Sequence, residues 1–223
     1  LDSEHPFVVV QTPLHGPNLF PSELPEFRTV VLEYMLEIIR VGNSVLEGIA
    51  LSLGLEASYF YDCYTKNPMQ MFQIFHYPKV ENPENLWGVG EHTDYGLLTI
   101  LKQDNSGGLQ VKSGRTGEWI EAPPVDDSFV CNIGDMLDRM TGGVYKSTLH
   151  RVKCQTNGSR FSYPFFLDPN FQVEVKPIEG YINLVDDKEE RWDKSSVHAF
   201  SGTYGDYLMR KYSIMFPKLF GQA

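Results

Sequence analysis

Two short polar motifs far apart in the chain most constrain what it can fold into. His92-Thr93-Asp94 places two potential metal ligands two residues apart, and His150 follows fifty-six residues after Asp94. On an extended strand, residues i and i+2 project to the same face, so His92 and Asp94 can reach one ion while Thr93 points away. Bringing His150 to the same point requires distant strands to become neighbours, as they do in a double-layered β fold.

The segments around these motifs have the pattern of short β-strands separated by turns. Gly107-Gly108 and the Gly-rich stretch 114–117 are turn signals on either side of the run 109–112. Short strands at this spacing indicate a sandwich or barrel. The expected strands cover 71–77, 96–102, 109–112, 129–133, 147–152 and 161–166.

The chain of 223 residues fits one domain, and its 42% apolar content is enough to bury a core. Ser22 is expected to cap a long helix, which Gly42 could interrupt. The charged stretch 186–191 is expected to be mobile and exposed. Along the chain we expect an irregular opening segment over 1–21, a helix over 22–54, a short helix over 58–64, a β core over 69–178, and a loop with a C-terminal helix over 179–223.

Charge and cysteine content narrow the partners and the compartment. The formal net charge is −10 with scattered basic residues, which argues against nucleic acid or a membrane and favours a small-molecule ligand. No apolar run approaches the roughly 20 residues that span a bilayer. Cys63, Cys131 and Cys154 have no CxxC spacing and lie in or beside apolar stretches, which predicts buried free thiols and a cytoplasmic location.

The identity of the metal depends on what accompanies the ligands. Neither an HxD motif nor a lone histidine is strong evidence by itself, since a lone histidine is more often a satisfied core residue. Zinc in a structural site usually takes cysteine ligands, and none lies near these motifs. Two imidazoles and one carboxylate leave open positions, as in non-haem Fe(II) centres that bind O2. Arg160 and Ser162, on one face of a strand, could hold one end of a dicarboxylate.

Six motifs in order along the chain resemble the Fe(II)/2-oxoglutarate-dependent dioxygenase superfamily, and within it the isopenicillin N synthase-like and plant-type group. The motifs are Phe75-His76-Tyr77-Pro78, Gly90-Glu91-His92-Thr93-Asp94-Tyr95-Gly96-Leu97-Leu98-Thr99, Gly108-Leu109-Gln110-Val111, Asn132-Ile133-Gly134-Asp135, Ser147-Thr148-Leu149-His150-Arg151-Val152 and Arg160-Phe161-Ser162. The resemblance covers roughly residues 13 to 218. The N-terminal region that members of this group usually carry is not found in the sequence.

The resemblance implies a mainly β fold with flanking helices, namely a double-stranded β-helix or cupin-like jelly roll, forming a single catalytic domain over 1–223. It implies that Arg160 and Ser162 bind the distal carboxylate of 2-oxoglutarate and that Tyr77 adds a hydroxyl to that cosubstrate. Asn132-Ile133-Gly134-Asp135 is interpreted as a structural turn. The catalytic iron ligands implied are His92, Asp94 and His150.

The implied activity is that of an oxidoreductase. With Fe(II), 2-oxoglutarate and O2, it would couple oxidative decarboxylation of 2-oxoglutarate to succinate and CO2 with hydroxylation, desaturation or cyclisation of a small molecule. Two alternatives stay open at this point. One is an iron oxidase of the isopenicillin N synthase type, in which Arg160 and Ser162 bind the substrate's own carboxylate. The other is a non-catalytic jelly-roll binding protein. The substrate and the oligomeric state are not predicted.

Overall fold

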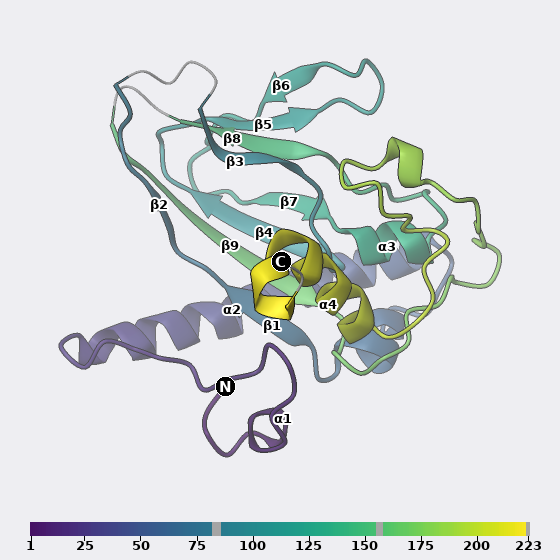
Figure 1. Cartoon of the computed structure of the whole chain (residues 1–223), viewed down its shortest axis with the longest axis horizontal. Helices are drawn as coiled ribbons and strands as arrows, with labels where there is room; N and C mark the ends of the chain where they lie inside the picture. Colours follow the sequence, from purple (N-terminus) through teal and green to yellow (C-terminus); the bar gives the residue numbers. More distant parts are fainter. Residues whose placement is uncertain (82–85, 155–157, 222–223) are drawn as a thin grey trace.

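The computed structural model describes residues 1–81, 86–154 and 158–221. In Figure 1 two antiparallel sheets lie one above the other, and helices gather around the larger sheet. The larger sheet has the strand order β1-β9-β4-β7, with β2 also paired to β9, and the smaller sheet has the order β3-β8-β5-β6. The expected mainly β fold with flanking helices is confirmed.

The elements of both sheets and their flanking helices have the following bounds. The strands are β1 Met69–Phe72, β2 Phe75–Tyr77, β3 Trp87–His92, β4 Leu98–Gln103, β5 Leu109–Lys112, β6 Trp119–Glu121, β7 Val130–Ile133, β8 His150–Lys153 and β9 Arg160–Asp168. The helices are α1 Pro6–Val9, α2 Pro25–Ser52, the π-helix η1 Tyr61–Thr65, α3 Asp135–Met140, the 3-10 helix η2 Lys188–Glu190, α4 Tyr204–Met215 and the 3-10 helix η3 Pro217–Phe220.

Strand β9 runs through the centre of the larger sheet and connects its parts. It pairs with β4 along one edge and with β1 and β2 along the other. Arg160 and Ser162 on this strand are buried, whereas Phe161 between them is exposed. Since alternate residues of a strand project to opposite faces, Arg160 and Ser162 share the face that points between the two sheets.

Helix α2 packs on the larger sheet and is continuous. It begins at Pro25, and no side chain caps its first turn, so the expected cap from Ser22 is wrong. Gly42 does not interrupt the helix either. A Cβ atom on Gly42 would lie 2.7 Å from Leu167 Cδ2 and 3.2 Å from Ile100 Cδ1, so the missing side chain lets the helix approach the sheet closely. Gly42 therefore allows close packing of the helix on the sheet and does not break the helix.

The opening segment and the expected short helix differ in detail from the sequence expectations, and the expected C-terminal helix is present as α4. Residues 1–21 are not irregular throughout, because they contain the one-turn helix α1. Near the expected short helix over 58–64 the structure has the π-helix η1. Helix α4 starts with a capping box in which Thr203 and Asp206 satisfy each other's backbone N–H groups.

No helix in the described ranges is both long and apolar enough to cross a membrane.

One expectation about burial is wrong, and another holds only in part. Cys63 and Cys131 are exposed and Cys154 is half-buried, so none of the three thiols belongs to the core. The sequence predicts an exposed stretch over 186–191, yet Asp187 and Arg191 in it are 9% and 7% exposed. These two charged side chains are buried because they pair with each other and because Arg191 also pairs with Asp138 of α3.

Candidate functional site

The three predicted ligands converge at one end of the smaller sheet. His92 ends β3, His150 begins β8, and the two residues are direct partners in the antiparallel pairing of these strands. Asp94 lies two residues beyond His92. Its Oδ1 atom is 3.7 Å from His92 Nε2 and 3.5 Å from His150 Nε2. One donor atom from each residue falls within 4.8 Å of the other two, which is close enough for all three to bind one ion.

Each imidazole is oriented by its other ring nitrogen. His92 Nδ1 lies 2.8 Å from the carbonyl oxygen of Gly90, and His150 Nδ1 lies 3.0 Å from that of Thr148. A carbonyl oxygen only accepts, so both Nδ1 atoms carry a proton, and each imidazole in its neutral form presents the lone pair of Nε2 to the centre. This is the arrangement in which histidine binds a metal.

Asp94 is held by two hydrogen bonds to the oxygen that faces away from the histidines. Thr99 Oγ1 and Asn132 Nδ2 donate to Asp94 Oδ2 over 2.5 and 2.7 Å. Thr99 and Asn132 are cross-strand partners in β4 and β7, so the sheet itself fixes both donors. The sequence interpretation missed these two residues and assigned Asn132 to a structural turn. The available signal was that both residues are polar and lie in predicted strands next to the site.

The titration of the three side chains reflects burial and mutual contact. Burial alone would raise the pKa of the Asp94 carboxyl, but the hydrogen bond and charge of His150, together with the charge of His92, hold it well below its ordinary value. Burial lowers the pKa of His92, as does the neighbouring His150. In His150 the opposing effect of the Asp94 carboxylate outweighs burial and raises the pKa. The site favours an ionised carboxylate beside the imidazoles.

The donor set fits a divalent transition metal. It offers two imidazole nitrogens and one carboxylate oxygen, all oriented by outer hydrogen bonds, and no cationic side chain in the described part of the chain pairs with Asp94. Three ligands leave further coordination positions for other molecules, as in the non-haem iron sites with two histidines and one carboxylate. The residues present therefore fit Fe(II).

The predicted carboxylate clamp lies on β9, where a guanidinium group is completely buried. Arg160 Nε donates to the carbonyl oxygen of Gly107 over 2.8 Å, and Nη2 donates to Gln103 Oε1 over 3.1 Å. Within the described ranges, Nη1 is buried and has no hydrogen-bond partner. A buried charged donor without an acceptor is unfavourable, so this atom is available for an anion.

Ser162 and Tyr77 lie beside this guanidinium. Ser162 is 3% exposed and shares the inner face of β9 with Arg160. Tyr77 on β2 is the cross-strand partner of Arg160, and the guanidinium carbon is 5.2 Å from the centre of its ring. Burial raises the pKa of the Tyr77 hydroxyl, which keeps it protonated and able to donate. The three residues fit the distal carboxylate of 2-oxoglutarate. Gln103, which orients the guanidinium, was not identified from the sequence.

Known proteins place this arrangement in a family. The sequence profile of the 2OG-Fe(II) oxygenase superfamily matches residues 68–169. A Dictyostelium discoideum protein named a probable iron/ascorbate oxidoreductase is 47% identical over 98% of this chain and 67% of its own length. A 1-aminocyclopropane-1-carboxylate oxidase of Dictyostelium mucoroides is 40% identical over 92% of this chain and 66% of its own length.

Solved structures agree with the sequence relatives. A full-length Neurospora crassa protein solved in complex with alpha-KG and thymine has a TM-score of 0.77 and 30% sequence identity, and the match covers 92% of this chain and 62% of that one. The likeness confirms the expected double-stranded β-helix fold. The chain spans about two thirds of the length of these relatives. It belongs to the 2OG-Fe(II) oxygenase superfamily, an oxidoreductase family whose cofactors are Fe(II), 2-oxoglutarate and O2.

Proposed function

We propose that this protein couples the oxidative decarboxylation of 2-oxoglutarate to the oxidation of a small molecule. The observation that carries the proposal is the pairing of two features, three converging ligand atoms within 4.8 Å and a buried guanidinium nitrogen without a partner. When bound, Fe(II) supplies the activation of O2, in which 2-oxoglutarate is converted to succinate and CO2.

The residues of the chain bind and orient in this scheme. His92, Asp94 and His150 hold the metal through Nε2, Oδ1 and Nε2, while Thr99 and Asn132 keep the carboxylate turned toward it. The outer hydrogen bonds fix each ligand before the metal arrives, which lowers the cost of binding it.

The clamp residues receive the far end of the cosubstrate. Arg160 offers Nη1 to one carboxylate oxygen, Ser162 offers its hydroxyl, and Tyr77 lies beside the guanidinium with a protonated hydroxyl. Charge-assisted hydrogen bonds of this kind are stronger than neutral ones. Because the Arg160 side chain is fully buried, water competes poorly for the guanidinium.

The substrate is proposed to be a small organic molecule. Relatives include a homoarginine-6-hydroxylase of Arabidopsis thaliana, 38% identical over 92% of this chain, and the Neurospora crassa protein in complex with thymine. The net charge of −10 makes a nucleic acid an unfavourable partner. The cytoplasmic location stays a prediction from the odd number of cysteines without CxxC spacing and from the lack of an apolar run long enough to span a bilayer.

Anaerobic titration of the Fe(II)-loaded protein with 2-oxoglutarate, followed by the visible metal-to-ligand charge-transfer band, tests the proposal. We expect a saturable band in the unaltered protein. The substitution Arg160→Gln should weaken the binding of 2-oxoglutarate about 10- to 100-fold, because hydrogen bonds to charged groups contribute about 1.5–3 kcal/mol. Arg115→Gln, in an exposed turn, is the matched control and should leave the titration unchanged.

The same titration, followed by an aerobic assay of O2 consumption, separates the alternatives. Stoichiometric iron binding without a band would refute 2-oxoglutarate as cosubstrate and favour the oxidase in which Arg160 and Ser162 bind the substrate. Iron binding with no O2 consumption, either with 2-oxoglutarate or with candidate substrates, would favour a non-catalytic binding protein.

A further inference from the structure

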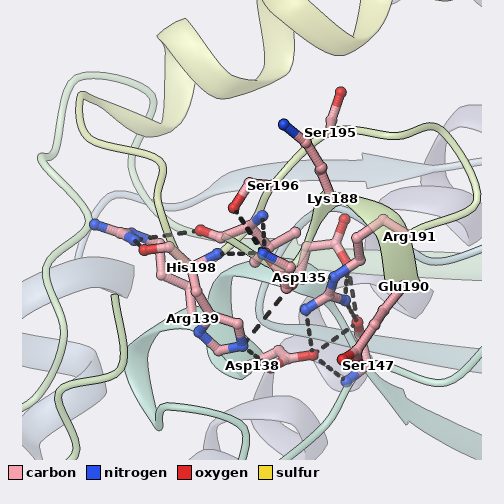
Figure 2. Close-up of polar contacts among 12 residues, drawn as sticks. Asp135, Asp138, Arg139, Ser147, Lys188, Glu190, Arg191, Ser195, Ser196 and His198 are labelled. Atoms are coloured by element: carbon pink, nitrogen blue, oxygen red, sulfur yellow. Dashed lines mark hydrogen bonds and ion pairs between the residues drawn. The ribbon is translucent and has the colours of Figure 1, made fainter. Parts of the chain in front are cut away.

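A network of buried charges lies behind the ligand set, and Figure 2 shows it centred on the loop that follows η2. The guanidinium of Arg191 bonds Asp187 through Nε at 2.5 Å, Asp138 through Nη2 at 3.0 Å, and Ser147 Oγ through Nη1 at 2.8 Å. Asp135 Oδ1 is 3.5 Å from Nη1. These five residues are called the Arg191 network below. All of them are at most 9% exposed, so the loop is anchored at this point.

The Arg191 network reaches the segment that carries His150. The backbone N–H of Ser147 donates to Asp138 Oδ2 over 2.9 Å, and its hydroxyl donates to Asp135 Oδ1 over 2.9 Å. One residue further on, the carbonyl of Thr148 accepts from His150 Nδ1. The network therefore fixes the chain three residues before a proposed metal ligand.

The same network reaches the segment that carries His92 and Asp94. The backbone N–H of Asp135 donates to the carbonyl oxygen of Asp94 over 2.8 Å. Immediately after Arg191, the indole Nε1 of Trp192 donates to Thr93 Oγ1 over 3.2 Å. Thr93 is 3% exposed and lies between the two ligands. A bond to its side chain fixes the backbone from which both ligands project.

Trp192 is itself held in place from its other side. The ammonium group of Lys211 on α4 forms an ion pair with Asp193 and lies 5.8 Å from the centre of the Trp192 ring. Lys211 is 3% exposed and also lies over the rings of Tyr95 and Tyr207. The indole is thus positioned by Arg191 along the chain and by Lys211 across space, which leaves it little freedom to turn away from Thr93.

We infer that Trp192 is a positioning residue of the metal centre, acting through the hydrogen bond to Thr93, and that the Arg191 network exists to hold it there. This inference rests on the proposed function for the metal itself. A purely structural role for the loop would predict a different result. In that case, replacing Trp192 would lower the stability of the metal-free protein but would leave the metal affinity and the geometry of the metal centre unchanged.

The test uses Co(II) as the probe, because it binds similar ligands to Fe(II) and reports their geometry in its visible spectrum. Trp192→Phe removes the indole N–H and keeps a large ring, and Thr93→Val removes the acceptor at nearly constant size. Each change should lower Co(II) affinity about threefold to tenfold, the range for one neutral hydrogen bond, and shift the Co(II) spectrum. The double variant should lose no more than either single variant, since both remove the same bond.

The controls separate this inference from the function on which it rests. Trp119→Phe makes the same substitution on β6, away from Thr93, and should leave affinity and spectrum unchanged. The inference is overturned if Trp192→Phe and Thr93→Val alter Co(II) affinity less than twofold and leave the spectrum in place, or if their effects add in full. Failure of the unaltered protein to bind Co(II) would overturn the proposed metal centre, and this inference with it.

Discussion

The proposed metal centre and the Arg191 network both bury carboxylates, but they balance the charge differently. In the network, one guanidinium lies within ion-pair distance of Asp135, Asp138 and Asp187. In the metal centre Asp94 faces two imidazoles, and among the described residues no lysine or arginine pairs with it. The network has its cation within the chain, whereas the metal centre is suited to take its cation from solution.

The pKa shifts of the three network carboxyls show whether hydrogen bonds and nearby cations outweigh the effect of burial. Burial raises the pKa of the Asp138 and Asp187 carboxyls, but hydrogen bonds from His198 and Ser196 and contacts with Arg191 lower it below its ordinary value. For Asp135 burial prevails, and the pKa is raised despite Lys211 and Arg191 nearby. Complete exclusion of water can therefore outweigh even two cations.

The largest effect is expected from removing the cation of the network. Arg191→Met leaves three buried carboxylates without their guanidinium, which should cost about 3–5 kcal/mol of unfolding free energy at neutral pH. Urea unfolding of the metal-free protein measures this. Arg40→Met removes an exposed arginine paired with Glu37 on α2 and should change stability by less than about 1 kcal/mol. A loss below about 1 kcal/mol in the Arg191 variant would mean that the carboxylates are not dependent on it.

The next effect should appear only when metal is present. His150→Ala removes one of three ligands and should weaken Co(II) binding by at least about 100-fold. Losing only a residue that hydrogen-bonds a ligand already lowers metal affinity about 10- to 100-fold. Isothermal titration calorimetry gives the affinity. His76→Ala, which removes an exposed histidine stacked on Phe161, is the control and should bind metal normally. Equal losses in both variants would contradict the ligand assignment.

A third effect depends on pH and concerns a carboxyl with neither a cation nor an imidazole. Asp168 accepts a hydrogen bond from Tyr204 Oη, and burial raises its pKa from 3.8 to about 7. Between these values the folded protein holds a proton that the unfolded chain has released, so stability falls as pH rises, by up to about 1.4 kcal/mol per pH unit. Asp168→Asn should abolish this fall, and its stability relative to the unaltered protein should increase from about pH 4 to about pH 7.

Urea unfolding at several pH values checks this last prediction in the metal-free protein. The control is Asp62→Asn, an exposed acid in η1, whose stability should follow the unaltered protein at every pH. Parallel curves for Asp168→Asn and the unaltered protein would show that the carboxyl is ionised in the folded state.

Much of the site could be predicted because its geometry follows from strand alternation. Arg160 and Ser162 are spaced by two residues on β9 and share a face of that strand, whereas His92 and Asp94 have the same spacing but Asp94 lies just beyond the end of β3. The contacts of Asp94 with Thr99 and Asn132 depend on the register between β4 and β7, which local pattern does not specify. Their role therefore required the structure.

The loop around Arg191 could not be predicted for a different reason. Its sequence, Asp186-Asp187-Lys188-Glu189-Glu190-Arg191, has the composition of an exposed segment, and Lys188 and Glu190 are indeed exposed. Asp187 and Arg191 are buried because they pair with each other and because Arg191 also pairs with Asp138 and donates to Ser147, 53 and 44 positions earlier in the chain. The composition of a segment does not show which of its residues find partners elsewhere in the chain. It therefore predicts the exposed residues of this loop correctly and the two buried ones wrongly.

The buried guanidinium of Arg160 has a consequence for which acids the pocket admits. Two of its nitrogens are already bonded to the protein, so only an acceptor that reaches Nη1 completes the set. A 2-oxo acid with a second carboxylate at the right distance would supply it, whereas a shorter oxo acid would leave a charged N–H buried without an acceptor, at a cost of about 1–3 kcal/mol or more. We expect the protein to discriminate between oxo acids by chain length, because only an acid of the right length places an acceptor at Nη1 of Arg160.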